Sequence, residues 1–593
     1  MLSRQEIRQE DKWRIEDIYA NDTLWEEDYK KFLSECEKPC KYKGNICASA
    51  DNLAFILDEQ DKADFLAEKI YVYAFMRYYE DTTNVLYQSM SDKAQMAVTK
   101  LAEKYSFVEP EILAIDDVII RQYLSEEAVK PYRQYIEDIL AGKQHILSDK
   151  EEKLLAAVQR MADAPSKIFS KFNNADIHFG YITDEKGEEI ELTHGRYSAF
   201  MESRDRQVRK SAFEALYKPY SSHIHTLAEM YYSDVKRAIF YANARNYTST
   251  LEMYLTQSFI PVRVYDNLLL TVNDNLDKMY DYVALRKHEL GVDELHFYDI
   301  YAPMVSDYTM KVDYKQAKEI VIQALQPLGE AYVAIVREGF DNGWVDVYEN
   351  AGKRNGAFSW GVYGTHPYVF LNYNDTLNDV FTVIHEMGHA MHTYYSNQSQ
   401  PHMYSGYKIF VAEVASTCNE TLLIHYLLKH CSDEKQRKYL INRYLEQFKG
   451  TLYRQTMFAE FEKNAHSMAE QGEVLCADNL CSLYKDLNVK YFGSNIVIDK
   501  EITYEWARIP HFYTPFYVYQ YATGFSAAIS IATRILDGDK KTLSGYMKFL
   551  SSGGSMHPID LLKLCGVDME QPQVVKEALH VFGKYLGMFN QPK

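Results

Sequence analysis

Residues 381–392 read FTVIHEMGHAMH, and this segment places two histidines on one face of a predicted helix. Positions i and i+4 lie on the same side of an α-helix, so His385 and His389 can direct their rings at one point. Glu386 directly follows the first histidine. This HExxH arrangement is typical of catalytic zinc sites, where two imidazoles bind the ion and the glutamate acts on the attacking water. The alternative is a chance pairing of histidines, and the rest of the chain has to decide between the two.

A catalytic zinc ion usually has three protein ligands and one open coordination position, so a third ligand is expected. A third histidine of the extended HExxHxxGxxH pattern would stand at position 395, where the chain has Tyr395, and this excludes that class. Residues 390–412 contain no Asp or Glu, and the first acid is Glu413, 28 residues after His385. We therefore predict Glu413 as the third ligand.

The segment that contains Glu413, FVAEVASTCNETLL (410–423), has the apolar spacing of a helix. Glu413 and Glu420 lie on one stripe of that helix, seven residues apart. Such a stripe usually faces solvent, but two histidines without an acid would leave a metal site incomplete. We expect Glu420 to accept a hydrogen bond from a ligand histidine and to orient it.

Glycines and strand-forming residues precede the histidine motif, in GAFSWGVYGTHPYVFLNYNDT (356–376). The run PYVFLNY (367–373) is a strand by composition. A strand beside a metal site commonly offers its edge to an extended peptide. We therefore predict substrate contacts in this segment, at Gly361, Tyr363 and Tyr368. The alternative is a purely structural hairpin.

Helical periodicity dominates the remaining sequence. Residues from about 10 to 175 show apolar spacing of about 3.6 residues and no cluster of His, Cys and acids. Residues 176–197 alternate apolar and polar side chains on both sides of a charged turn, which predicts a β-hairpin. We predict a mainly α fold with a small β-sheet beside the zinc site. Its N-terminal helical region, 1–200, ends in the hairpin, and its catalytic region is 201–593.

The composition excludes several function classes. A net charge of −19 provides no electrostatic footprint for nucleic acid or an anionic membrane. The most apolar long run, 516–536, carries Gln520, Arg534 and several hydroxyl groups, so we expect a buried or cleft-lining helix and no membrane span. The polar start MLSRQEIRQEDKW is not expected to be a signal peptide, and the eight cysteines are expected to be reduced thiols. We predict a cytoplasmic protein.

Several segments resemble oligoendopeptidase F, within the thimet-oligopeptidase-type zinc metallopeptidases. The most specific feature is an HExGH motif followed by a glutamate near position +28 in a VAEVAS-like setting. The resemblance extends over roughly residues 110 to 590. The supporting segments are GAFSWGVYGTHPYVFLNYND, RDRQVRKSAFEALY (204–217), ARNYTSTLEMYL (244–255) and WARIPHFYTPFYVYQYATGF (506–525).

The resemblance implies a large helical ellipsoid with a deep substrate channel and a zincin-like catalytic core. It implies one Zn²⁺ per chain, bound by His385, His389 and Glu413, with Glu386 as the general base. The implied reaction is hydrolysis of internal bonds in short unstructured peptides. The expected partners are those peptides, without nucleic acid or membrane, and the expected assembly is a monomer or a small homo-oligomer.

The resemblance also implies a histidine and tyrosines from the C-terminal segment that contact the substrate and the developing oxyanion. His511 matches that histidine. The tyrosine match is open among Tyr517, Tyr519 and Tyr521, because the spacing differs from that of the eukaryotic members. We prefer Tyr521 as the oxyanion donor, with Tyr517 as a second catalytic candidate and Tyr519 as a substrate contact.

Three other function classes compete with this interpretation. A thermolysin-type or carboxypeptidase-type zinc enzyme would share HExxH but should have a different third-ligand context or a group that recognises a chain end. A catalytically silent peptide-binding homologue would be expected to lack Glu386 or a ligand, and none is missing. A helical-repeat scaffold would show a period of about 34–45 residues, and we find none.

Overall fold

Helices form most of the secondary structure in the computed structural model, which describes residues 2–36, 39–305, 308, 310–589 and 591. Within these residues the strands are short and fall into one two-stranded and one three-stranded sheet. This confirms the predicted mainly α class with a small β-sheet. None of the helices in the described ranges is long and apolar enough to cross a lipid bilayer.

The chain divides into two compact units, each built from three separate stretches. Unit 1 comprises residues 1–144, 309–426 and 531–567, and unit 2 comprises 145–308, 427–530 and 568–593. The predicted regions 1–200 and 201–593 are continuous stretches of sequence, whereas each compact unit combines several stretches. The predicted division stays a prediction.

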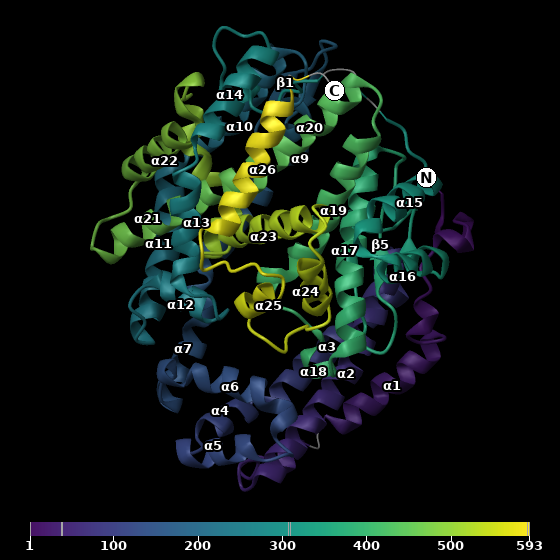
Figure 1. The fold of residues 1–593 in the computed structure, drawn as a ribbon. Helices are drawn as coiled ribbons and strands as arrows, with labels where there is room; N and C mark the ends of the chain where they lie inside the picture. Colours follow the sequence, from purple (N-terminus) through teal and green to yellow (C-terminus); the bar gives the residue numbers. More distant parts are fainter. Residues whose placement is uncertain (1, 37–38, 306–307, 309, 590, 592–593) are drawn as a thin grey trace. The chain divides into compact units, whose positions relative to one another are not determined.

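The helices of unit 1 carry the histidine motif. The helices that begin in unit 1 are α1 (Asp22–Glu35), α2 (Ala50–Glu80), α3 (Val85–Tyr105), α4 (Val108–Leu113), α5 (Asp117–Ser125), α6 (Arg133–Ala141), α15 (Tyr314–Ala324), α16 (Glu330–Asp341), α17 (Leu377–Ser399), α18 (His402–Ser405), α19 (Ile409–His430), α24 (Lys540–Leu550) and α25 (Pro558–Leu564). α1, α2 and α3 pack against one another, and α17 lies beside α15 and the three-stranded sheet (Figure 1).

The core of unit 1 joins these N-terminal helices to the sheet. Trp13, Ile70 and Tyr73 are buried in one cluster with Phe370 of the sheet. α2 begins after Ser49, whose hydroxyl accepts from the Asn52 N–H and caps the helix. Because Ile70 and Tyr73 belong to α2 and Phe370 to the sheet, burial of these side chains in one cluster holds the sheet against α2.

The three-stranded sheet consists of β3 (Val345–Asp346), β4 (Phe358–Trp360) and β5 (Tyr368–Phe370), in the order β3-β5-β4. β5 pairs parallel with β3 and antiparallel with β4, so both of its edges are used. The prediction that PYVFLNY offers its edge to a peptide is therefore wrong. Within the described residues, β4 is the outermost strand at the end of the sheet opposite β3, and its outer edge is unpaired.

The register of β4 shows which of its backbone groups are free to pair. The N–H of Val369 donates to the carbonyl of Trp344 at 2.8 Å, so this residue of β5 bonds toward β3. Ser359 lies opposite Val369. Since bonded and non-bonded pairs alternate along an antiparallel ladder, the N–H and C=O of Ser359 point away from β5. β4 therefore presents one donor and one acceptor at its outer edge.

Unit 2 contains the predicted hairpin. β1 (Tyr181–Thr183) and β2 (Glu189–Glu191) pair antiparallel, which confirms it. The other helices that begin in unit 2 are α7 (Asp149–Ala162), α8 (Ala164–Lys171), α9 (His194–Met201), α10 (Arg206–Ser222), α11 (Ile224–Ala244), α12 (Thr250–Thr256), α13 (Val262–Asn273), α14 (Asp277–Glu289), α20 (Glu434–Phe448), α21 (Arg454–Glu470), α22 (Ala477–Phe492), α23 (Tyr519–Leu536) and α26 (Gln573–Phe589).

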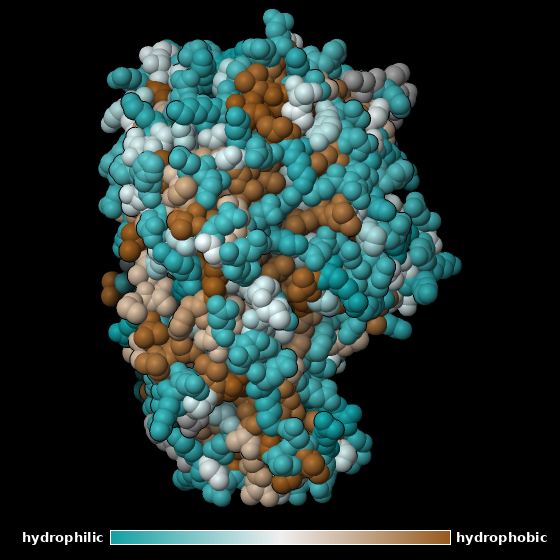
Figure 2. Space-filling view, turned by 90° about the vertical axis from the view of Figure 1, so that its left-hand side faces the viewer, coloured by the Kyte–Doolittle hydropathy of each residue, from teal (hydrophilic) through white to brown (hydrophobic). Residues whose placement is uncertain are grey.

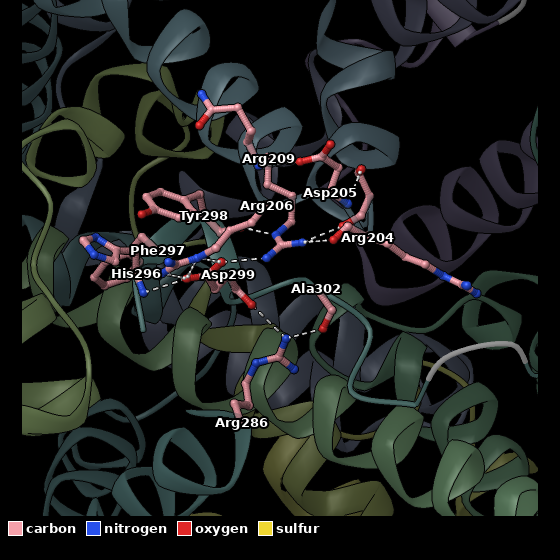
Figure 3. Close-up of polar contacts among 12 residues, drawn as sticks. Arg204, Asp205, Arg206, Arg209, Arg286, His296, Phe297, Tyr298, Asp299 and Ala302 are labelled. Carbon is pink, nitrogen blue, oxygen red and sulfur yellow. Dashed lines mark hydrogen bonds and ion pairs between the residues drawn. The ribbon is translucent and has the colours of Figure 1, made fainter. Parts of the chain in front are cut away.

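A buried carboxylate ties the start of α10 to the segment that follows α14. Asp299 is fully buried, and it accepts from Arg206 at 2.8 Å and from Arg209 at 2.7 Å (Figure 3). Arg286 donates to the backbone carbonyl of Asp299 at 3.0 Å, and the N–H of His296 donates to its carboxylate. Removing one partner of such a buried pair costs about 3–5 kcal/mol, because the other charge is then left uncompensated.

Hydrophilic residues cover much of the face drawn in Figure 2, with hydrophobic side chains in scattered groups between them. This mixture agrees with the charged fraction of 25% and the net charge of −19.

Candidate metal centre

The helix that carries the histidine motif, α17, begins with a capping box. The hydroxyl of Thr376 accepts from the N–H of Asp379 at 3.2 Å, and the Asp379 carboxylate accepts from the Thr376 N–H at 2.9 Å. These bonds satisfy backbone donors that the first turn would otherwise leave unpaired. α17 then runs for 23 residues, so His385 and His389 lie within one continuous helix.

His385, His389 and Glu413 form the only group in the described part of the chain whose side chains could together hold a metal ion, with all ligand atoms within 4.8 Å of one another. The Oε2 atom of Glu413 lies 3.4 Å from Nε2 of His385 and 3.4 Å from Nε2 of His389. Three ligands at about 2.05 Å from a tetrahedral zinc ion are about 3.3 Å apart. The spacing and the donor set of two imidazoles and one carboxylate therefore fit a small ion of this kind.

Gly388 lets α19 approach α17 closely enough to bring Glu413 to the histidines. A Cβ atom on Gly388 would lie 2.6 Å from Cα of Ser416 and 2.9 Å from the carbonyl oxygen of Ala415, so no larger residue fits without a shift. The hydroxyl of Ser416 donates to Oε2 of Glu413 at 2.9 Å and holds that carboxylate in place. Neither residue is among those predicted from the sequence, although the glycine inside the HEMGH motif is a visible signal of a close contact between helices.

Glu420 contacts the far side of the first histidine. Its Oε1 lies 2.5 Å from Nδ1 of His385, which fixes the ring so that Nε2 faces Glu413. On the same helix, Asn419 donates to the carbonyl of Ile384 at 3.3 Å and is fully buried. These contacts join α19 to α17 beside His385.

The electrostatic environment of the group favours a positive charge between the side chains. Burial acts to lower the pKa of His385, but its hydrogen bond to Glu420 and the nearby carboxylates raise that pKa to about 9. Burial acts to raise the pKa of Glu413, but contact with His389 and the charges of both histidines lower it to about 2. The carboxylate of Glu413 is therefore ionised at neutral pH.

Glu386 is 7% exposed and lies within the electrostatic influence of both histidines. Burial raises its pKa above the usual value for glutamate, and the histidines only partly oppose this effect. A carboxylate with a raised pKa is a stronger base, which suits proton transfer near neutral pH.

The three substrate contacts predicted near the strand segment differ in accessibility. Gly361 follows β4, and a Cβ there would lie 2.2 Å from Cγ2 of Thr393 on α17. Tyr363 is half-buried, and its hydroxyl donates to the carbonyl of Gln400 at 2.9 Å. Tyr368 is fully buried, so its side chain does not reach a bound peptide and that prediction is wrong.

The C-terminal residues gather in unit 2. The ring of His511 lies 6.0 Å from that of Tyr517 and 6.0 Å from that of Tyr521, and the two tyrosine rings are 5.4 Å apart. Burial lowers the pKa of His511. Tyr519 is 1% exposed and packs on Tyr265 at 5.0 Å, so it faces the core of unit 2 and is not a surface for substrate.

A strained turn directly precedes these tyrosines. Phe516 has φ +55°, which a bulky residue adopts only at a cost of about 1–3 kcal/mol. The buried carboxylate of Glu462 accepts from the Phe516 N–H at 3.0 Å. The turn lies directly before α23, and Tyr517 follows Phe516 with its ring stacked on that of His511.

Comparisons with known proteins agree with this site. The model of "Peptidase family M3" matches residues 199–581, and the model of "Oligopeptidase F" matches residues 111–179. The chain is 47% identical to Oligopeptidase PepF of Bacillus subtilis (strain 168), over 98% of this chain and 87% of the relative.

Solved structures show the same relationship. A crystal structure of oligoendopeptidase-F from Enterococcus faecium superposes with a TM-score of 0.74 at 36% identity, covering 96% of this chain and 98% of the other. A structure from Chlamydophila abortus gives a TM-score of 0.94 at 35% identity, with 99% of each chain covered. The protein described here belongs to peptidase family M3.

Proposed function

We propose that this M3 metallopeptidase is an oligoendopeptidase that uses one zinc ion held by His385, His389 and Glu413. The observation that carries the proposal is the 3.4 Å spacing of Glu413 from both histidines, beside Glu386 in the HEMGH motif. Glu420 is proposed to orient His385 through its hydrogen bond. The catalytic region is proposed to be 201–593.

Glu386 is the proposed general base. When bound, the zinc ion polarises the peptide carbonyl and makes water more acidic. Glu386 accepts the proton of the attacking water and delivers it to the nitrogen of the leaving amine. Its position directly after His385 places it beside the proposed ligands, and its side chain is largely shielded from solvent.

His511, Tyr517 and Tyr521 are the proposed partners of the developing oxyanion. A tyrosine hydroxyl or an imidazole N–H can donate to the negative oxygen, and one such donor contributes roughly 10²–10³ in rate. Tyr521 remains the preferred donor, and the ring contacts among the three residues support a shared role.

The peptide is proposed to add to the outer edge of β4. The free N–H and C=O of Ser359 can pair with the backbone of an extended chain, and backbone pairing reads the sequence loosely. Gly361 and Tyr363 continue this edge, so they remain the proposed substrate contacts. A folded domain keeps its backbone inside its own structure, which limits substrates to short unstructured peptides. We further infer a cytoplasmic monomer or small homo-oligomer.

The test is a length series of peptides that share one cleavable core, with casein and a native globular protein alongside. We expect internal cleavage of peptides of several to about twenty residues, loss of activity with chelator, and recovery when zinc is added back. Digestion of the native protein would favour an open-cleft protease. Removal of single residues from one end would favour a carboxypeptidase.

A further inference from the structure

A cavity of about 720 Å³ that is open to solvent lies in unit 1, between α2, α3, α6 and the end of β4. Its volume is sufficient for a large side chain with its first hydration shell. The lining residues that bear on its chemistry are Asp64, Glu68, Tyr71, Glu109, Tyr135 and Trp360.

The charged side chains that line this cavity are all acidic. Among its lining residues in the described ranges, none is Lys or Arg. Glu68 accepts from the backbone N–H of Tyr363 at 3.1 Å and lies 3.5 Å from Nε2 of His402. Among the described residues, neither Asp64 nor Glu109 forms an ion pair. The cavity therefore has an excess of negative charge.

The setting of Asp64 shows that this charge is only partly compensated, by His402. Burial raises the pKa of Asp64 to about 6, and the charge of Asp61 adds to this rise while that of His402 opposes it. A carboxylate in such surroundings is stabilised by a cation that approaches it.

Aromatic rings complete the wall. The rings of Tyr71 and Trp360 lie 5.9 Å apart at an interplanar angle of 71°, and Tyr135 lines the same cavity. The faces of such rings attract cations, and they pack well against the methylene stem of a lysine or arginine. An acidic cavity with aromatic walls thus suits a cation on an apolar stem better than it suits an anion or a small neutral group.

The cavity is connected to the proposed substrate edge through Trp360. This residue ends β4, and the next residue, Gly361, packs against Thr393 of α17. Thr393 lies one helical turn beyond His389, about 6 Å along the helix axis. An extended peptide advances about 3.3 Å per residue, so a peptide paired with β4 can place a side chain in the cavity a few residues from the cleaved bond.

We propose that this cavity binds a positively charged side chain of the peptide substrate, arginine or lysine, and so gives the enzyme a preference for a basic residue at one substrate position. This inference rests on the proposed oligoendopeptidase function, because it assumes a peptide along β4. Asp64 and Glu109 supply the charge, and Trp360, Tyr71 and Tyr135 contact the stem.

The test uses peptides that differ only by arginine or citrulline, which has nearly the same shape without the charge, scanned along one cleavable sequence. With the zinc-loaded full-length protein, we expect kcat/KM to be about tenfold higher for arginine at one position. The double variant Asp64→Asn/Glu109→Gln should reduce this ratio to near one. Glu103→Gln, an exposed residue of α3 outside the cavity, is the matched control and should leave the ratio unchanged.

The outcomes separate this inference from the proposed function. Equal cleavage of arginine and citrulline peptides at every position would overturn the cavity proposal and leave the oligoendopeptidase function intact. A preference that survives the double variant would also overturn it. If neither peptide is cleaved, the proposed function has failed, and calorimetric titration of the same two peptides decides the cavity proposal by their relative affinity.

Discussion

Glu420 lies 2.5 Å from Nδ1 of His385, on the opposite side of the imidazole from the Glu413 carboxylate. A ring held at Nδ1 by a carboxylate can use only Nε2 to bind a metal ion, and the same contact makes that nitrogen a better donor. The orientation of the first proposed ligand therefore depends on a residue outside the proposed ligand set.

We predict that Glu420→Gln lowers zinc affinity by about 10–100-fold, because the histidine loses its charged acceptor. The measurement is zinc retention in a chelator competition series. Glu413→Ala should lose the metal at lower chelator concentrations than Glu420→Gln. Glu338→Gln, an exposed residue of α16, should match the wild type. Equal retention by Glu420→Gln and the wild type would mean that the contact does not tune the site.

Glu386→Gln should keep the metal but lose activity. The amide cannot accept the proton of the attacking water, and general-base catalysis contributes about 10²–10⁴ in rate. We expect kcat to fall at least 100-fold while the zinc content and the thermal transition stay those of the wild type. A variant that retains more than a few per cent of the activity would assign the base to another residue.

Gly361→Ala should disturb both packing and catalysis. The added Cβ would lie 2.2 Å from Cγ2 of Thr393, a β-branched side chain that has little freedom to move. We expect a loss of about 1–3 kcal/mol of stability and roughly a tenfold lower kcat/KM.

A second substitution tests the cause. Thr393→Ser removes the clashing methyl group and keeps the hydroxyl that lies 3.1 Å from the Tyr407 hydroxyl. The double variant Gly361→Ala/Thr393→Ser should recover most of the stability. If it does not, the glycine is required for another reason.

Tyr521→Phe should lower kcat by about 10²-fold without changing the zinc content, because the developing oxyanion loses one donor. Tyr519→Phe should leave kcat within about twofold of the wild type, since that side chain is buried. Steady-state kinetics with one peptide distinguish the two. An effect on KM alone would indicate substrate binding, and an effect at Tyr517 with none at Tyr521 would move the role to Tyr517.

His402 should stabilise unit 1 in a pH-dependent way. Its Nδ1 lies 2.7 Å from Asp61 and its Nε2 lies 3.5 Å from Glu68. Burial acts to lower its pKa, but these two hydrogen bonds raise the pKa to about 9. The unfolded value is about 6.5, so the stabilisation is fully present below pH 6.5 and is lost as the pH rises through about 9.

The measurement is the thermal transition of the wild type and of His402→Gln across this range. The difference should amount to about 2–3 kcal/mol near pH 6 and should nearly vanish above pH 9.5. His288→Gln, whose side chain is 79% exposed, is the control and should show little difference at any pH. A difference that is constant with pH would show that packing and not charge is responsible.

Local helix geometry explains why the group of candidate metal ligands could be predicted from the sequence. The positions of His385 and His389 relative to each other follow from the helical repeat, and Glu413 follows from the lack of acids before it. The contact between Glu420 and His385 required only that the second helix run beside the first. Such features depend on short spacings that are visible in the sequence.

Other features depend on contacts between distant segments, which a single sequence does not display. PYVFLNY is a strand, but its place in the centre of the sheet depends on β3, a strand of only two residues. The sequence predicts Tyr519 at the substrate, but this side chain lies in the core, three residues after the positive φ of Phe516. Neither the strand order nor the strained turn produces a periodic pattern in the amino-acid sequence from which it could be predicted.

The contact between Gly388 and Ser416 determines how far apart the two helices hold the proposed ligand atoms. Two atoms bound to the same zinc ion can be at most about 4.2 Å apart, which is twice the bond length. In the structure the carboxylate oxygen is 3.4 Å from each imidazole nitrogen. The distance between the carboxylate oxygen and an imidazole nitrogen can therefore increase by less than about 1 Å, which is less than the thickness of one methyl group. A side chain at position 388 that moved the two helices apart would exceed this limit. Gly388, the smallest residue in the motif, therefore determines how closely the proposed ligand atoms can be held together.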